Sequence, residues 1–385
     1  MTDGSGEDLL AVAQTAGETA RASHDVVLEV DGLTVGFPTD DGLVRAVRGV
    51  SYRLRRGEVL GIVGESGSGK SVTSMAVMGL LPGSARVAGS VRFGGKELLG
   101  APDPELAKIR GRRIAMIFQD PMTSLNPVYT IGYQIAEAVR AHHDVSKDAA
   151  LKRAAELLEI VRIPNAKARL GSYPHELSGG MRQRVVIAIA MANDPDVIIA
   201  DEPTTALDVT VQAQILDALD TAREETGAAM VLITHDLGVI AGRADRVLVM
   251  YAGKLVESGS AEDVFYTPRM PYSLGLLGSL PRIDRPSERL TPIPGAPPSL
   301  VNMPPGCPFT PRCPLAREIC DEDEPALEPT TDPDHTAACH FSDELVGVGP
   351  EQLFGTRVTD TAALAEFVRE TAALDSTTDT QDNAS

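Results

Sequence analysis

The sequence lacks tryptophan, has only 4% aromatic residues and contains no long hydrophobic run. No stretch approaches the roughly 18 consecutive apolar residues that a transmembrane helix needs. The amino-terminal end carries acids at Asp3, Glu7 and Asp8, where a signal peptide has basic and then apolar residues. We therefore expect neither a transmembrane span nor a signal peptide. With 385 residues, 43% of them hydrophobic, the chain is long enough for two domains plus tails.

Basic residues are also scarce, with 35 Lys and Arg against 54 Asp and Glu, for a net charge of -19. Residues 1–30 hold six acids and one base, and residues 341–385 hold nine acids and two bases, so the two ends contribute -5 and -7. Such acid-rich, aromatic-poor ends are typical of solvated chain. We predict a disordered lead at 1–25 and a disordered acidic tail at 342–385. The acidic balance argues against a nucleic-acid partner.

Cysteine is rare, and all four cysteines lie within one short segment. Their intervening gaps of five, six and eighteen residues do not match the two-residue spacing of zinc ribbons. Four thiolates nevertheless suffice for zinc or an iron–sulfur cluster, and His335 and His340 lie near enough in sequence to replace one of them. Unliganded buried thiols are the alternative. The cysteines are Cys307, Cys313, Cys320 and Cys339.

Residues 64–71 read Gly-Glu-Ser-Gly-Ser-Gly-Lys-Ser, a full phosphate-binding loop. The apolar run 59–63 precedes it and a helical pattern at 72–81 follows, which is the order that the motif needs. Glycines let the backbone N–H groups surround an anion, the lysine adds charge, and the serine hydroxyl reaches Mg²⁺. The positive end of the helix faces the same phosphates. The residues expected to hold phosphate are Gly64, Ser66, Gly67, Gly69, Lys70 and Ser71.

Short apolar strands alternate with helical segments along the chain, which predicts an α/β fold with a parallel sheet covered on both faces. The segment from about 121 to 184 has helical spacing without strands, so we expect a helical subdomain inserted between sheet strands. Proline-rich sequence at 292–314 marks a change of architecture. The expected strands are 26–35, 46–54, 59–63, 113–118, 197–200, 230–234 and 246–251.

Polar residues follow several of these expected strands. Asp201 and Glu202 end the strand 197–200, and ligands of parallel sheets bind at the carboxyl ends of strands. Asp201 suits Mg²⁺, and Glu202 suits polarisation of the attacking water. Gln119 follows another strand and can contact Mg²⁺ or water, while His235 follows a third and can donate to a γ-phosphate. An acidic turn and a solvent-facing glutamine are the structural alternatives.

A second candidate anion site begins at Leu177-Ser178-Gly179-Gly180-Met181. Ser178 can donate its hydroxyl, and the two glycines expose N–H groups at a helix start. An ordinary serine N-cap is the alternative. Two glycines there cost roughly 1 kcal/mol each relative to alanine, which favours a binding role.

In this order, the phosphate loop, Gln119, Ser178–Met181, Asp201-Glu202, the run 206–208 and His235 resemble the nucleotide-binding subunit of ABC transporters. The resemblance covers about residues 26–340 and implies a P-loop NTPase fold that binds ATP and Mg²⁺. It implies that Phe37 stacks on adenine, Gln119 senses the transmembrane subunit, and Ser178, Gly179 and Gly180 contact ATP held by the opposite subunit. It further implies that Asp201 supports Mg²⁺, Glu202 is the general base, Asp208 lies between subunits, and His235 is the switch histidine. Met181 departs from the glutamine of many members.

The run 118–127 and the segments 271–277 and 292–295 are similar to the peptide-importer branch, with an extension like that of oligopeptide and dipeptide subunits around 306–313. This resemblance implies a nucleotide-binding domain at 26–270 and a cysteine-containing extension at 271–341. Related subunits carry a comparable cysteine tail that can hold a 4Fe–4S cluster, so we prefer that cluster and place zinc second.

The resemblance also implies partners, because one phosphate loop and one Ser178–Gly180 segment cannot close a site alone. It implies a second, homologous ATPase, two transmembrane permeases and an extracytoplasmic peptide-binding protein, with the chain peripheral on the cytoplasmic face of the cell membrane. The alternatives are an importer of nickel or another small solute in the same branch, or a soluble ABC ATPase acting on DNA or ribosomes. The acidic balance and single ATPase module disfavour the last.

Overall fold

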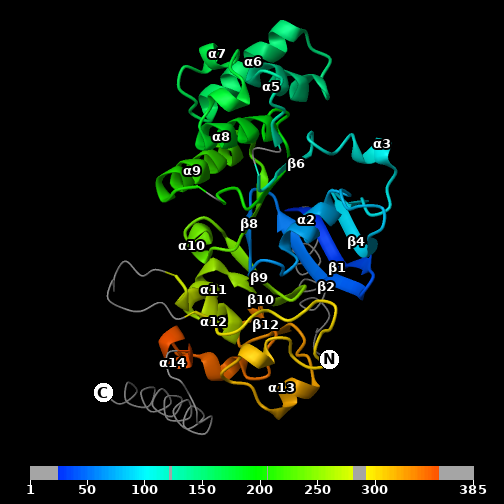
Figure 1. Cartoon of the computed structure of the whole chain (residues 1–385), viewed down its shortest axis with the longest axis vertical. Coiled ribbons are helices and arrows are strands. Elements are labelled where there is room, and N and C mark those ends of the chain that lie inside the picture. Colours follow the sequence, from blue (N-terminus) through cyan, green and yellow to red (C-terminus); the bar gives the residue numbers. More distant parts are fainter. Residues whose placement is uncertain (1–24, 121–123, 206, 281–291, 355–385) are drawn as a thin grey trace, which may run out of the picture.

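An eight-stranded sheet forms the centre of the computed structural model, which describes residues 25–120, 124–205, 207–280 and 292–354. Helices lie on either side of this sheet (Figure 1). In the order in which they lie across the sheet, the strands are β11 (Glu328–Pro329), β12 (Thr336–Ala337), β10 (Lys254–Ser260), β9 (Arg246–Tyr251), β3 (Val59–Val63), β8 (Ala229–Thr234), β7 (Val197–Asp201) and β6 (Ile114–Ile117).

Five neighbouring strands, from β6 to β9, are parallel, which confirms the expected parallel α/β sheet. Strands β3, β7 and β8 are buried throughout, as continuous apolar strands covered on both faces must be. Val63 pairs with Thr234, and Asp201 pairs with Ile233. The carboxyl ends of these strands therefore meet at one edge. The antiparallel strands β10, β12 and β11 continue the sheet on its other side.

A second, antiparallel sheet was not expected from the sequence. Its order is β2 (Gly42–Arg55), β1 (Val26–Thr39), β4 (Arg86–Phe93) and β5 (Lys96–Glu97). Buried residues of this sheet, among them Leu28 and Leu54, share a core with Leu60 and Ile62 of β3 and with α2 (Lys70–Val77). The short helix α3 (Asp103–Leu106) follows it. The helix predicted at 72–81 thus begins two residues earlier and ends at Val77.

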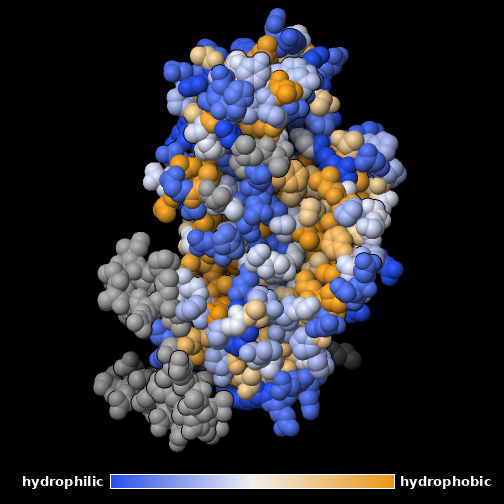
Figure 2. All heavy atoms as spheres, in the orientation of Figure 1, coloured by the Kyte–Doolittle hydropathy of each residue, from blue (hydrophilic) through white to orange (hydrophobic). Residues whose placement is uncertain are grey.

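The segment between β6 and β7 carries helices and no strand among its described residues. They are α5 (Ile131–Arg140), α6 (Lys147–Ile160), α7 (Ala166–Arg169), the 3-10 helix η1 (Pro174–Glu176) and α8 (Gly179–Ala190). Thr130 and Ser146 cap α5 and α6. Helix α9 (Val209–Thr226) follows β7, and these helices form the upper part of Figure 1. Polar side chains cover much of that part in Figure 2, and hydrophobic ones gather lower, in the middle of the same face.

The C-terminal residues pack beneath the large sheet in Figure 1. Their helices, after α10 (Leu237–Ile240), are α11 (Ala261–Tyr266), α12 (Pro271–Gly278), α13 (Glu318–Glu322) and α14 (Pro350–Phe354), with the 3-10 helices η2 (Thr310–Arg312) and η3 (Ser342–Leu345). Leu345 and Leu353 are buried against Leu274 and Leu315. The packed extension therefore reaches at least residue 354, past the expected boundary at 341, because these leucines bury apolar surface. The lead 1–24 and residues 355–385 lie outside the described residues. None of the described helices is long and apolar enough to cross a membrane.

Candidate functional site: a phosphate loop and the strand ends around it

The phosphate loop connects β3 to α2 and depends on glycine at two tight positions. Gly64 has φ +153°, and a Cβ there would lie 2.2 Å from the carbonyl oxygen of Met250. Gly69 has φ +103°, and a Cβ there would lie 2.4 Å from the carbonyl oxygen of Ala46. Gly69 also begins α2 without a side-chain cap, so the first N–H groups of the helix stay available to an anion.

Lys70 is the buried cation of this loop. Its side chain is 4% exposed, and its Nζ donates to the carbonyl oxygens of Gly64 at 2.7 Å and Glu65 at 3.0 Å. Nζ also lies 3.9 Å from Oε1 of Glu202. Burial lowers the pKa of Lys70, while the carboxylates of Glu202, Asp201 and Glu65 act in the opposite direction.

Glu202 is the point on which side chains from several strand ends converge. Its Oε2 accepts hydrogen bonds from Gln119 Nε2 at 3.1 Å and Thr205 Oγ1 at 2.9 Å, and lies 3.2 Å from Nδ1 of His235. Glu202 has φ +45°, a left-handed conformation that costs energy outside glycine and concentrates at functional sites. The geometry can orient a water molecule and withdraw a proton from it.

Asp201 lies at the end of β7 beside the phosphate loop. Ser71 Oγ donates to its Oδ1 at 2.9 Å. Burial raises the pKa of Asp201, and the hydrogen bond from Ser71 works against this shift. An oxygen pair from a carboxylate and a hydroxyl is the kind of ligand set that Mg²⁺ takes in phosphate sites. Of the three residues named from the sequence as magnesium ligands, Ser71 and Asp201 are therefore in direct contact, while Gln119 donates to Glu202.

One cavity of about 800 Å³ is lined by the phosphate loop, by Gln119, Glu202 and His235, and by Phe37 of β1, while Asp201 lies behind Ser71 and does not line it. The same cavity thus has both phosphate-binding residues and an aromatic side chain in its wall, and a nucleotide needs both. Leu300 of the C-terminal segment also lines it, and its carbonyl oxygen accepts a hydrogen bond from Arg45 N–H at 3.4 Å. Leu300 could not be predicted from the sequence, because no local pattern places a residue so distant along the chain at this cavity.

Ser178, Gly179, Gly180 and Asp208 are not among the residues that line this cavity. Ser178 caps α8 by accepting from Met181 N–H at 3.3 Å, and Asp208 caps α9 by accepting from Val211 N–H at 3.0 Å. A Cβ on Gly180 would lie 2.6 Å from Val211, so this glycine lets α8 and α9 pack closely. Helices α8 and α9 lie away from α2 in Figure 1. Within one chain, the second candidate anion site stays separate from the first.

The four cysteines are free thiols near one another in the C-terminal extension. Cys307 N–H donates to the carbonyl oxygen of Cys320 at 2.7 Å. Burial, with smaller contributions from the nearby thiols of Cys307 and Cys320, raises the pKa of Cys339 to about 12. Burial likewise raises the pKa of Cys313. Among the described residues, no group of three or more His, Cys, Asp or Glu side chains is arranged to hold a metal ion.

The two histidines that were candidates to replace a cysteine have other partners. His335 is 2% exposed, and its Nε2 lies 2.7 Å from Oε1 of Glu257. Nε2 of His340 lies 3.1 Å from the carbonyl oxygen of Asp323. Both nitrogens are thus committed to local hydrogen bonds.

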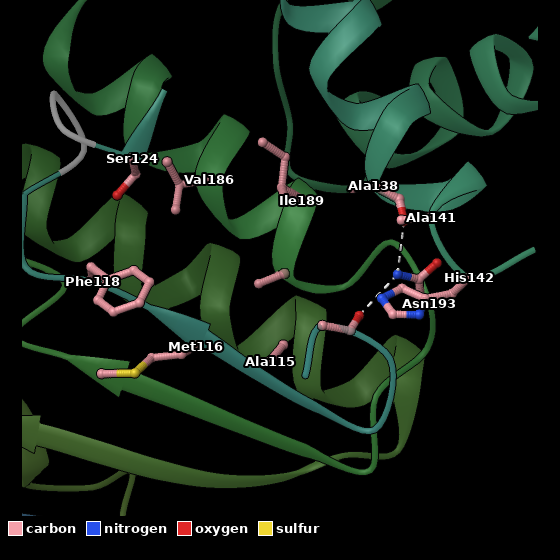
Figure 3. Close-up of a pocket in the computed structure, with 12 residues that line it drawn as sticks. Ala115, Met116, Phe118, Ser124, Ala138, Ala141, His142, Val186, Ile189 and Asn193 are labelled. Carbon is pink, nitrogen blue, oxygen red and sulfur yellow. Dashed lines mark hydrogen bonds between the residues drawn. The ribbon is translucent and has the colours of Figure 1, made fainter. Parts of the chain in front are cut away.

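A second cavity, of about 580 Å³, lies between β6 and the helical segment (Figure 3). Met116 and Phe118 line it from β6 and the residue after it, and Val186 and Ile189 line it from α8. Asn193 lies at the far end and donates to the carbonyl oxygens of Gly111 at 2.9 Å and Ala138 at 3.1 Å. Its walls are mostly apolar, and it adjoins Gln119 through Phe118.

This fold and site define an ATP-binding cassette, and comparison with known proteins agrees. Residues 47–205 match the ABC transporter family, and residues 256–320 match the oligopeptide/dipeptide transporter C-terminal region. The chain belongs to the ABC transporter family, in the branch that carries this C-terminal region.

Several curated relatives are similar along most of the chain. It is 52% identical over 320 residues to the oligopeptide transport ATP-binding protein OppD of Escherichia coli, covering 83% of this chain and 94% of that protein. It is 53% identical over 320 residues to the dipeptide transport ATP-binding protein DppD of Bacillus subtilis, covering 83% and 95%. Identity to OppD of Mycobacterium tuberculosis is 58% over 323 residues, but the match spans 83% of this chain and only 53% of that longer protein.

Solved structures agree with the fold assignment. The dimeric structure of an ATP-binding cassette in a post-hydrolysis state, bound to ADP and Pi, has a TM-score of 0.55 and 29% identity, and covers 61% of this chain and 98% of that one. The expected P-loop NTPase fold is confirmed.

Substitution of Gly69 by alanine tests the loop geometry. The new Cβ would lie 2.4 Å from a backbone oxygen at φ +103°, so the loop must shift. We expect ATP affinity, measured by titration with a fluorescent ATP analogue, to fall by about tenfold or more, the size of a strained, displaced backbone. Gly83→Ala is the matched control, because its Cβ meets nothing within 4 Å at an ordinary φ. Equal affinity in the two variants would contradict this account.

Proposed function

We propose that this chain is the ATP-hydrolysing subunit of an importer that takes up oligopeptides or dipeptides across the cytoplasmic membrane. ATP and Mg²⁺ occupy the cavity at the phosphate loop. Lys70 and the loop N–H groups bind the phosphates, Ser71 and Asp201 hold Mg²⁺ with Gln119 close by, and Phe37 stacks on adenine. Mg²⁺ neutralises charge on the phosphates, and the chain's residues supply position and electrostatics.

The observation that supports this proposal most is the environment of Glu202. Its carboxylate lies 3.9 Å from Nζ of Lys70 and accepts hydrogen bonds from Gln119 and Thr205, and Nδ1 of His235 lies 3.2 Å from it. A carboxylate so oriented next to a phosphate loop suits activation of water as general base, and His235 suits contact with the γ-phosphate.

The separation of Ser178–Gly180 and Asp208 from the cavity supports a partnership with a second, homologous ATPase subunit. Each chain then lends its α8 start to ATP held by the other, and ATP favours the closed pair through its greater affinity for it. Two permeases and an extracytoplasmic peptide-binding protein complete the proposed system. The chain itself lies at the cytoplasmic face of the membrane. Nickel or another small solute is the alternative cargo.

Glu202→Gln tests the assigned base. The amide keeps the shape of the side chain but cannot accept the proton of water, so we expect ATP hydrolysis by the assembled transporter to fall by about 100-fold or more. ATP binding should be retained. Phosphate release and nucleotide binding are measured side by side, with Glu262→Gln, an exposed position on α11, as the control. Unchanged hydrolysis in Glu202→Gln would reject this role.

The cavity beside β6 supports a docking site for a helix of the permease. Phe118 lines it and is 42% exposed, and Val128 and Tyr129, in the segment that leads from Phe118 to α5, are 69% and 46% exposed. Such a group of exposed apolar residues marks an interaction surface. Phe118 directly precedes Gln119, and the amide of Gln119 donates to Glu202. A helix that contacts Phe118 would therefore lie next to a residue of the hydrolysis site.

Val128→Asp tests this docking site, because a buried, unpaired charge opposes association. We expect the permeases recovered with the ATPase subunit to fall by about tenfold, while ATP binding by the purified subunit stays unchanged. Val145→Asp is the control, since Val145 is an exposed apolar residue between α5 and α6, outside the segment that leads from Phe118 to α5. Full recovery of permeases with Val128→Asp would exclude this surface.

The four cysteines support a structural metal or 4Fe–4S site only in part. Their thiols lie close enough to raise one another's pKa, and bound metal would favour the thiolate forms. The described geometry is not a ready ligand set, so metal binding would require the thiols to draw together. We place the 4Fe–4S cluster first and zinc second, and in either case the bound metal would hold the extension together.

Metal content decides this point. In anaerobically purified protein we expect about four iron and four sulfide per chain, because that is the content of one 4Fe–4S cluster, and loss of both in Cys313→Ser. About one zinc per chain would select the zinc alternative. Protein that is folded and binds ATP, yet contains neither metal, would leave the cysteines as buried thiols.

A further inference from the structure

A carboxylate stands inside the phosphate loop itself. Glu65 follows Gly64 and lines the cavity that holds the candidate ATP site. Burial lowers the pKa of Lys70, and the charge of Glu65 is close enough to act against that shift. A bare carboxylate at this place would repel the phosphates of a nucleotide and weaken their binding.

A guanidinium from the C-terminal extension covers this carboxylate. Arg312 Nη1 lies 2.7 Å from Oε2 of Glu65, and Nη2 lies 2.8 Å from Oε1. This is a parallel, two-point pair, the strongest geometry for such ions. Arg312 is 5% exposed and the side chain of Glu65 is 27% exposed, so water reaches the pair mainly from the side of Glu65.

Further contacts hold the side chain of Arg312 in place. Its Nε donates to the carbonyl oxygen of Pro294 at 2.9 Å, and Nη1 donates to the hydroxyl of Tyr251 at 3.3 Å. The guanidinium lies 5.8 Å from the centre of the Phe309 ring. Phe309 packs edge-on against Tyr251 and Tyr272. The guanidinium is therefore held before any nucleotide arrives.

The same extension also holds the backbone of Glu65. The N–H of Glu65 donates to the hydroxyl of Tyr272 on α12 at 2.7 Å. Both the side chain and the main chain of one loop residue thus contact the extension. Meanwhile the carbonyl oxygen of Glu65 accepts from Lys70.

We propose that Arg312 is a positioning residue of the ATP site, which neutralises Glu65 and holds the phosphate loop in its binding shape. The C-terminal extension is on this view part of the nucleotide site. This inference rests on the proposed function only in that ATP is the ligand of the loop. A purely structural ion pair is the competing account, and the two differ in what happens when both charges are removed.

The test is a set of full-length variants titrated with Mg·ATP through a fluorescent ATP analogue. Arg312→Gln leaves Glu65 unpaired beside the phosphates, and we expect affinity to fall about tenfold, the size of one nearby like charge in a protein surface site. Arg312→Gln combined with Glu65→Gln removes the repelling charge and should recover most of the affinity. Arg312→Lys keeps the charge and should recover part of it.

Glu65→Gln alone probes the same contact without altering the buried core of the extension, in case Arg312→Gln does not fold. It leaves the guanidinium charge unopposed, so affinity should equal or exceed that of the unaltered chain. The matched control is Arg317→Gln, because Arg317 makes a similar two-point pair with Glu344 within the extension. Thermal melting of each variant separates lost affinity from lost folding.

Each outcome bears on one claim. If the unaltered chain binds no more ATP than Lys70→Ala, the proposed function fails. If the chain binds ATP but Arg312→Gln binds as well as Arg317→Gln, or the double variant stays as weak as Arg312→Gln, the role of Arg312 is structural only. A loss of affinity in Glu65→Gln would likewise overturn charge neutralisation.

Discussion

The site depends on one buried cation surrounded by carboxylates. Lys70 is 4% exposed and feels the charges of Glu202, Asp201 and Glu65. Each carboxylate has its own donor: Gln119 and Thr205 for Glu202, Ser71 for Asp201 and Arg312 for Glu65. Because these donors partly compensate each negative charge, the three carboxylates repel a phosphate bound at the loop less than unpaired carboxylates would.

The parallel sheet explains how such distant residues meet. Strands β3, β7 and β8 lie side by side with their carboxyl ends at one edge, so the residues that follow them share one space. The strain at Glu202, with φ +45°, persists because its N–H donates to the carbonyl oxygen of Ile233 on β8 at 2.9 Å. The turn that aims the carboxylate is thus fixed by the sheet on which it ends.

The sequence reveals what is encoded over short distances. The spacing of the phosphate loop, the apolar strand before it and the polar residues after the strands are local patterns. They predicted the parallel sheet and, around Glu202, Gln119 and His235, but not Thr205. The antiparallel sheet, Leu300 and Arg312 were missed for a common reason. Arg312 contacts Glu65 across 247 residues of sequence, and no period or motif records a contact formed by tertiary packing. The acidic tail was placed too early because charge at 343, 344 and 351 outweighed the buried leucines 345 and 353.

The arrangement of α8 bears on the proposed pairing of two subunits. In this chain the side-chain oxygen of Ser178 accepts from Met181 N–H, and Gly180 packs against Val211. The start of α8 is therefore already capped and packed. Helix α8 has twelve residues and begins with two glycines, and the first N–H groups of such a helix favour an anion. The start of α8 does not line the cavity at Lys70, so within this chain its N–H groups do not face that cavity. In the proposed pair, each α8 start would supply donors to the nucleotide that the other subunit holds, which gives a physical reason for two subunits to close around ATP.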